Sequence, residues 1–126
     1  MPSVLIVEDN FLESKSLEEL FLSHGYTIAG VTVTGEAAVS LADSRHPDVL
    51  VVDVSLPGRV DGIEAAILIR SEHSCGLVFL TGHYDQETLT RMNAVAPDDI
   101  LPKPMTELGL MQAVEGALAR RKIVHH

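Results

Sequence analysis

The sequence has little of several features that would point away from a simple globular domain. It holds a single cysteine, Cys75, so an internal disulfide is impossible, and the following Gly76-Leu77-Val78 is typical of a strand entrance rather than a metal cluster. No apolar run approaches the roughly 18 residues of a membrane-spanning helix, and no basic-then-apolar signal precedes Val4. These absences predict a reduced, cytoplasmic protein that is neither secreted nor inserted in a membrane.

Positive charge is scarce as well. Nine Lys and Arg face 18 Asp and Glu, which gives a formal charge of −9 and a pI near 4.9. Such a surface repels a phosphate backbone, so nucleic acid is not expected as a direct partner. The one basic run, Arg120-Arg121-Lys122, is expected to complement the negative end of the last helix. His125-His126 are native or the stub of a tag, and we assign them no function.

The length and composition fit one domain with one core. The chain has 126 residues, of which 46% are apolar and 21% charged, and it contains no internal repeat or low-complexity tract. We expect the domain to span residues 1–122 and residues 123–126 to form a tail. Too few residues follow the domain to form a second one, so we expect any output to pass through a partner protein.

Short β-branched runs alternate with helical patterns along the chain. The runs predict strands over residues 4–7, 28–33, 49–53, 77–81 and 100–101, and apolar residues recur at helical spacing between them. His24-Gly25, Thr34 and Pro47 mark element boundaries. Near-continuous apolar strands are typical of a parallel sheet covered on both faces. The sequence therefore predicts a doubly wound α/β fold with five βα units.

Polar side chains follow four of these strands, where ligands bind in open α/β sheets. Glu8-Asp9 follows the first strand, Asp53 ends the third, Thr81 ends the fourth and Lys103 follows the fifth. If the strand order is the flavodoxin-like 2-1-3-4-5, these side chains converge on one rim. Each residue taken alone is ordinary turn, cap or strand chemistry, but their joint placement favours a site.

Carboxylates gathered this closely repel one another unless a hard cation lies among them, and oxygen ligands describe a Mg²⁺ site. An aspartate there can attack phosphorus and form an acyl phosphate if the phosphoryl charge is neutralised. In this interpretation Asp9 and Asp53 bind the metal directly and Glu8 holds a metal-bound water. Lys103 and Thr81 then contact phosphoryl oxygens.

On these motifs, nearly the whole chain resembles a response-regulator receiver domain. They are Val4-Leu5-Ile6-Val7-Glu8-Asp9-Asn10, Val51-Val52-Asp53-Val54-Ser55-Leu56-Pro57-Gly58, Thr81 and Leu101-Pro102-Lys103-Pro104, where the family usually has a cis peptide before the proline. The resemblance implies a single-domain response regulator of two-component or phosphorelay signalling. It would take a phosphoryl group on Asp53 from a histidine kinase or histidine phosphotransfer protein, with Mg²⁺ also bound by the Ser55 backbone carbonyl. It would not be an enzyme acting on another substrate, although it could catalyse its own phosphorylation and dephosphorylation, and its output would be altered binding to an unknown downstream protein.

Two stretches depart from the usual receiver pattern. Most receivers carry Tyr or Phe three residues before the lysine, where this chain has Ile100, a residue typical of a fixed core position. Phe79-Leu80-Thr81-Gly82-His83-Tyr84 resembles the Phe-Ala-Thr-Gly-x-Tyr motif of an atypical receiver subgroup in which that aromatic is lost. Tyr84 is then either the reporter of the switch or a cover for the next helix.

Other positions keep two interpretations each. His83 would overlook the phosphoryl group and position water, or it would simply face solvent. The loop over residues 56–62 is one residue longer than the common form. Either the extra residue is tolerated on the surface without a role, or Arg59 contacts a partner protein.

Two competing functions stay open. A receiver-like module could bind partners without phosphorylation, since the presence of the site residues does not prove their use. A phosphohydrolase of the haloacid dehalogenase type would also use an Asp nucleophile with Mg²⁺, but it needs Asp-x-Asp on the first strand, whereas Asp53-Val54-Ser55 follows the third. A phosphate sink, a relay shuttle and a kinase regulator look identical at this level.

Overall fold

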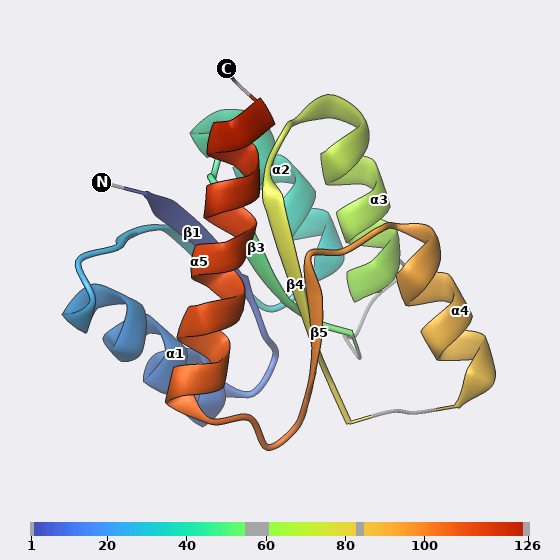
Figure 1. Ribbon diagram of the computed structural model, residues 1–126, viewed down its shortest axis with the longest axis horizontal. Coiled ribbons are helices and arrows are strands. Elements are labelled where there is room, and N and C mark those ends of the chain that lie inside the picture. The colour runs from blue at the N-terminus through green and yellow to red at the C-terminus, as the bar shows by residue number, and fades with distance from the viewer. Residues whose placement is uncertain (1, 55–60, 83–84, 125–126) are drawn as a thin grey trace.

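Helices and strands alternate along the chain in a computed structural model that describes residues 2–54, 61–82 and 85–124 (Figure 1). The elements in chain order are β1 Ser3–Val7, α1 Phe11–Ser23, β2 Thr27–Thr32, α2 Gly35–Arg45, β3 Val49–Asp53, α3 Gly62–Glu72, β4 Gly76–Thr81, α4 Gln86–Ala94, β5 Asp99–Pro102 and α5 Glu107–Val124. None of the helices in the described ranges is long and apolar enough to cross a membrane.

The strands form one parallel sheet in the order β2-β1-β3-β4-β5. Val4 pairs with Val49, Val49 with Gly76, and Val78 with Asp99, so the carboxyl ends of β1, β3, β4 and β5 meet at one edge. This confirms the predicted flavodoxin-like α/β fold. Pro102 is tolerated in β5 because this strand lies at the edge of the sheet, where one side needs no ladder hydrogen bonds.

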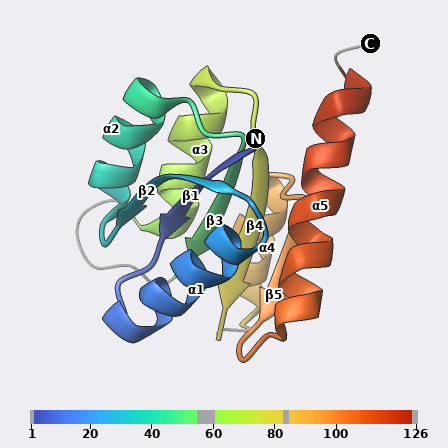
Figure 2. The same cartoon turned by 90° about the vertical axis from the view of Figure 1, so that its left-hand side faces the viewer.

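Two apolar clusters cover the two faces of the sheet, because side chains alternate between faces along each strand. Figures 1 and 2 show α1 and α5 on one face and α2, α3 and α4 on the other. The first cluster lies under α1 and α5. Its strand residues are Val4, Ile6, Val49, Val51, Val78 and Leu80. The second cluster lies under α2, α3 and α4. It contains the strand residues that alternate with those of the first cluster: Leu5, Val7, Leu50, Val52, Leu77 and Phe79.

The helix ends agree with the predicted boundaries. Thr34 caps α2 by accepting a hydrogen bond from the Ala37 N–H, as expected from its position. The chain leaves α1 through Gly25, whose φ of 84° lies in the left-handed region that glycine adopts without strain. Cys75 is a buried free thiol immediately before β4, which matches its interpretation as a strand entrance.

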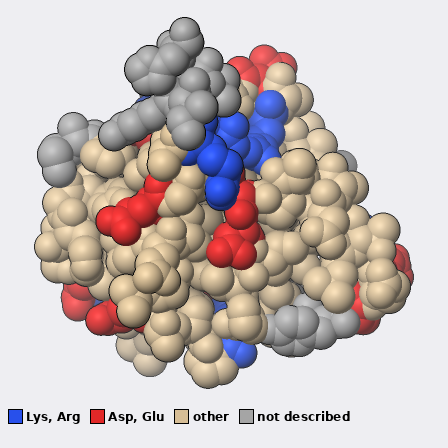
Figure 3. All heavy atoms as spheres, viewed as in Figure 1, with Lys and Arg blue, Asp and Glu red and all other residues tan. Residues whose placement is uncertain are grey.

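A buried carboxylate, Asp98, joins three elements at the end of the sheet opposite the predicted site. It accepts hydrogen bonds from Leu77 N–H (2.8 Å), Arg120 Nε (2.7 Å) and an Arg121 nitrogen (3.2 Å). Arg70 of α3 approaches it at 3.6 Å. Figure 3 shows basic side chains gathered beside acidic ones in the upper part of the molecule. The two α5 arginines therefore hold Asp98, in addition to lying near the helix end as the sequence predicted.

The charge state of Asp98 follows from these contacts. Burial would raise its pKa, but the bonds from Arg120 and the Leu77 N–H and the charge of Arg121 outweigh burial, so the pKa of Asp98 lies below its usual range. Its contribution to stability is therefore present above the unfolded pKa of about 3.9 and is lost as pH falls through the lower folded pKa.

We expect Asp98→Asn to lower the free energy of unfolding by about 3 kcal/mol at neutral pH, because it leaves three guanidinium groups without their buried counter-charge. Chemical denaturation followed by circular dichroism measures this. The exposed neighbour Asp99→Asn is the matched control and should change stability by less than about 0.5 kcal/mol. The difference between Asp98→Asn and the parent should shrink towards acid pH, and a constant difference would contradict the ionised state of Asp98.

Candidate functional site

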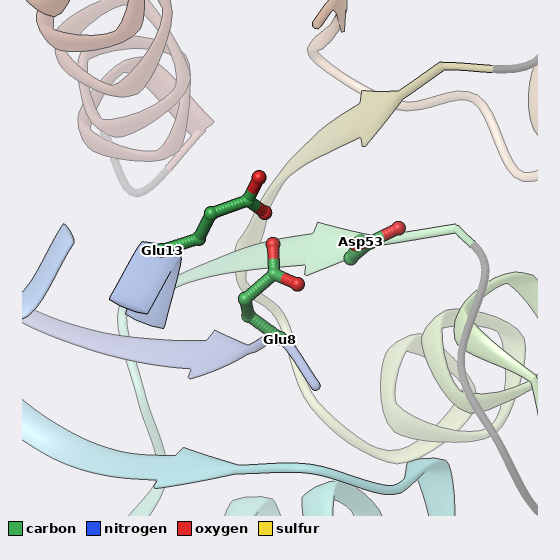
Figure 4. Close-up of side chains that lie close together, drawn as sticks. All are labelled: Glu8, Glu13 and Asp53. Atoms are coloured by element: carbon green, nitrogen blue, oxygen red, sulfur yellow. The ribbon is translucent and has the colours of Figure 1, made fainter. Parts of the chain in front are cut away.

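One ammonium group joins three carboxylates at the carboxyl edge of the sheet. Lys103 Nζ, just after β5, donates to Asp53 Oδ2 at 2.7 Å, to Glu13 Oε2 at 3.1 Å and to Glu8 Oε1 at 3.3 Å. Figure 4 shows the three acidic side chains beside one another, at the ends of β1 and β3 and at the start of α1. Residues 95 positions apart thus meet at one point, as the strand order requires.

Strand alternation explains why these side chains share a side. Along β1 and β3 the residues facing α1 and α5 are Val4, Ile6, Val49 and Val51. Two positions on, the same face carries Glu8 and Asp53. Both side chains are removed from solvent, with Glu8 1% and Asp53 6% exposed, so their charges depend on protein partners.

Glu13 belongs to this group and was missed by the sequence prediction. It lies in the first turn of α1, where an acidic residue three positions after the N-cap is usually interpreted as part of a helix cap. The sequence indicated its position only through its spacing of three residues from Asn10. Asn10 caps α1, and side chains in the first turn of the helix lie near the carboxyl edge of the sheet. Carboxylate oxygens of Glu8, Glu13 and Asp53 lie within 4.8 Å of one another.

Electrostatics in the cluster favour a protonated lysine. Burial would lower the pKa of Lys103, but the hydrogen bonds to Asp53 and Glu13 and the charges of Asp53 and Glu8 outweigh it, so the pKa lies above its usual value. Burial raises the pKa of Glu8 to about 8; the Asn10 N–H opposes this shift and Asp53 adds to it. The repulsion among these acidic side chains is therefore reduced both by the charge of Lys103 and by proton binding at Glu8.

Two further positions hold the backbone of the site, one beside Lys103 and one beside Asp53. Thr81, fully buried at the end of β4, accepts a hydrogen bond from the Lys103 N–H on its carbonyl at 2.9 Å. Gly62 opens α3 directly against the Asp53 carbonyl, and a Cβ at this position would collide with that oxygen and with the Val52 side chain. Only glycine allows so close an approach of helix and strand.

The remaining predicted residues have the following places. Asp9 is exposed at the end of β1 and lies outside the acidic group of Glu8, Glu13 and Asp53 within the described part of the chain. Ile100 is half-buried and packs against the cluster beneath α2, α3 and α4, in agreement with a core role. The Lys103-Pro104 peptide is cis. Ser55, Arg59, His83, Tyr84, His125 and His126 lie outside the described residues.

A groove with a volume of about 600 Å³ lies between α1 and the segment joining β5 to α5, and it includes part of the acidic cluster. Glu8, Glu13 and Lys103 line the groove together with apolar side chains that include Leu12, Leu17 and Leu110. Leu12 and its neighbour Phe11 are largely exposed. A reactant can therefore reach the polar end of the groove across an apolar wall.

The fold and site define a class of signalling domain, and comparison with known proteins identifies it. The model of the response regulator receiver domain family matches residues 4–115. This chain belongs to the response regulator receiver domain family.

Among relatives, the transcriptional regulatory protein PdtaR of Mycobacterium tuberculosis is 36% identical over 117 residues, which cover 93% of this chain and 57% of PdtaR. AfsQ1 of Streptomyces coelicolor is 30% identical over 95% of this chain and 52% of its own length. This chain thus spans about half the length of these curated relatives.

A solved structure supports the same assignment. The signal receiver domain of a modulated diguanylate cyclase from Desulfovibrio desulfuricans is 36% identical, with a TM-score of 0.93 over 98% of both chains. Receiver domains of two-component signalling are typically phosphoacceptors rather than true enzymes.

Proposed function

We propose that this chain is a cytoplasmic response-regulator receiver that accepts a phosphoryl group on Asp53 from a histidine kinase or histidine phosphotransfer protein. The observation that carries the proposal is the 2.7 Å contact between Asp53 Oδ2 and Lys103 Nζ, inside a group of carboxylates at the carboxyl edge of the sheet. An aspartate held there beside a fixed cation is suited to nucleophilic attack on phosphorus.

The transfer can be written with the chain's own residues. An Asp53 carboxylate oxygen forms a bond to phosphorus while the bond from phosphorus to the donor's imidazole nitrogen breaks. The electron pair returns to the imidazole, and Asp53 becomes an acyl phosphate. Lys103 offsets the negative charge on the phosphoryl oxygens, and the Thr81 hydroxyl would bind one of them. The groove beside α1 is lined by Lys103, Glu8 and Glu13, so a donor seated in it would lie next to the lysine that contacts Asp53.

The donor set fits a hard divalent cation, because carboxylate oxygens of Glu8, Glu13 and Asp53 lie within 4.8 Å of one another. We propose Mg²⁺, held by Asp9, Asp53 and the Ser55 carbonyl, with Glu8 contacting a metal-bound water. Of the three carboxylates that lie together, Asp53 would then be a direct ligand and Glu8 an indirect one, whereas Asp9 would join them from outside the group. When bound, the ion would supply further positive charge to the phosphoryl oxygens. Glu8, with a pKa near 8, would have to lose its proton before it could accept from that water as a carboxylate.

Asp53→Asn should abolish phosphoryl labelling, because the amide cannot form the acyl phosphate. The measurement uses radiolabelled acetyl phosphate with Mg²⁺, followed by mass spectrometry of the intact protein. Full labelling of Asp53→Asn would disprove the assignment. An unlabelled but correctly folded parent would favour the alternative of a binding module that works without phosphorylation.

Mg²⁺ should raise the melting temperature of the parent protein by offsetting repulsion among the carboxylates. At a free concentration ten times Kd the expected stabilisation is about 1.4 kcal/mol. Asp9→Asn should weaken Mg²⁺ binding, so a higher Mg²⁺ concentration should be needed for half of the rise in melting temperature. An identical metal dependence in Asp9→Asn would exclude Asp9 as a ligand. Asp43→Asn, an exposed acid on α2, controls for net charge.

We place the output on β4, α4 and β5, following the resemblance to receiver domains. Met92 is the only fully buried residue among those described on α4, so this helix is tied to the core by few side chains. Gly82 offers backbone freedom after Thr81, and a Cβ there would meet no atom within 4 Å. Phosphorylation at Asp53 would draw Thr81 inward and move α4, with Tyr84 as reporter, towards a state that a downstream protein binds.

Backbone NMR shifts should therefore change along residues 82–95 when beryllofluoride, a phosphoryl mimic, is added with Mg²⁺. The same titration of Asp53→Asn should leave these signals in place. Changes in the parent confined to the neighbourhood of Asp53, with residues 82–95 unaffected, would contradict the proposed output.

A further inference from the structure

Two arginine contacts join α4 to α3, and they differ in their exposure to water. Arg91 of α4 donates to Asp61 Oδ2 at 2.8 Å, and the two side chains are 42% and 30% exposed. The Arg70 side chain of α3 is only 17% exposed, and it contacts carbonyl oxygens at the end of α4 as well as Asp98. Water and salt therefore weaken the contact of Arg91 more than those of Arg70.

Arg70 holds the turn that follows α4. Its guanidinium donates to the Ala96 carbonyl at 2.7 Å and to the Val95 carbonyl at 3.1 Å. The Arg70 Nε donates to the Cys75 carbonyl, at the entrance of β4, at 3.2 Å. Ala96 has a φ of 55°, in the left-handed region that a residue with a side chain rarely adopts. The bonds from Arg70 help to keep this conformation, so the end of α4 is tied to both α3 and β4.

Helix α3 is held in the core more firmly than α4. Among the described residues of α4, only Met92 is buried. In α3 five residues are buried, and the first of them lies against the Asp53 carbonyl: Gly62, Ile63, Ala65, Ala66 and Ile69. A relative movement of the two helices would therefore displace α4 more readily than α3.

Asp61 is kept in place by its role as the N-cap of α3. Its Oδ1 accepts a hydrogen bond from the Glu64 N–H at 2.8 Å, while its Oδ2 accepts from Arg91. Asp61 could not follow α4 without losing its capping bond. If α4 moves away from α3, the contact between Arg91 and Asp61 is therefore the one that breaks.

This contact belongs to the arrangement in which the Asp53 carboxylate is free, since Asp53 Oδ2 lies 2.7 Å from Lys103 Nζ in the same structure. An interaction that is made in only one of two arrangements stabilises that arrangement relative to the other. Loss of the ion pair should therefore favour the arrangement in which α4 has moved.

We propose that the Arg91–Asp61 ion pair is a latch that stabilises α4 in the unphosphorylated arrangement, and that the turn bound by Arg70 stays fixed when the latch opens. This inference rests on the proposed function, namely the phosphoacceptor role of Asp53 and the output through α4. It makes the ion pair a determinant of how readily the domain is activated.

The first test measures the affinity for beryllofluoride with Mg²⁺, from the amide shifts around Asp53. Arg91→Gln opens the latch and should tighten binding by up to about fivefold, the size expected of one exposed ion pair. Long-range charge effects alone predict the opposite, because Arg91→Gln removes a positive charge and so should weaken the binding of an anion. Lys15→Gln removes the same charge from an exposed position of α1, and this matched control should give no tightening.

Asp61→Asn removes the other partner, and the asparagine can still cap α3. In the Asp61→Asn background the latch is already open, so Arg91→Gln should then give no further tightening. The amide spectrum shows whether each variant is folded.

Amide hydrogen exchange provides a second measurement, which needs no phosphoryl mimic. Arg91→Gln and Asp61→Asn should each speed exchange along α4 by up to about fivefold, and the double variant should exchange no faster than either one alone. The Asp98 amide, which donates to the Leu77 carbonyl at 2.8 Å beside the turn held by Arg70, should keep its exchange rate. Lys15→Gln should leave the exchange rates of α4 and of Asp98 unchanged.

Unchanged or weaker beryllofluoride binding by Arg91→Gln would overturn the inference, and so would further tightening by Arg91→Gln in the Asp61→Asn background. Unchanged exchange along α4 would show that the ion pair does not hold the helix. Exchange that speeds up equally at Asp98 and along α4 would contradict the fixed end. If the parent protein binds no beryllofluoride, the proposed function fails instead, and the exchange rates still decide whether the ion pair holds α4.

Discussion

The site depends on the attraction between one ammonium and three carboxylates at the edge of a parallel sheet. Glu8 and Asp53 are almost completely removed from water, and without Lys103 they would face each other with no fixed counter-charge. The strand order brings the lysine there, because β5 ends at the same edge as β1 and β3. The cis Lys103-Pro104 peptide and the Thr81 carbonyl lie beside it.

Much of this arrangement could be predicted from the sequence, because it follows from strand alternation and strand order. Apolar periodicity located all five strands, and Glu8, Asp53, Thr81 and Lys103 are informative because each ends or follows one. Sequence alone also gave the boundaries at Gly25 and Thr34, where a single residue type serves a local need.

Other features could not be predicted, because they depend on competition between side chains far apart in the chain. In the sequence, the spacing of Asn10 and Glu13 is that of an ordinary helix cap. In the structure, the Asn10 N–H instead donates to Glu8, so Glu13 does not complete the cap. The Asp98 cluster requires α3, β4 and α5 to meet, and no local pattern pairs Asp98 with Arg70 or Arg120. The basic run near the end of α5 suggested a helix-dipole role, whereas two of its members also neutralise a buried acid.

The contact between Gly62 and the Asp53 carbonyl has a mechanical consequence. A helix that starts in contact with a strand's last carbonyl cannot move closer to the sheet without displacing that carbonyl. Asp61, the cap of this helix, is in turn bound by Arg91 of α4 at 2.8 Å. A larger residue at position 62 would push the start of α3 away from the Asp53 carbonyl and, through Asp61, would also disturb the contact with Arg91 of α4.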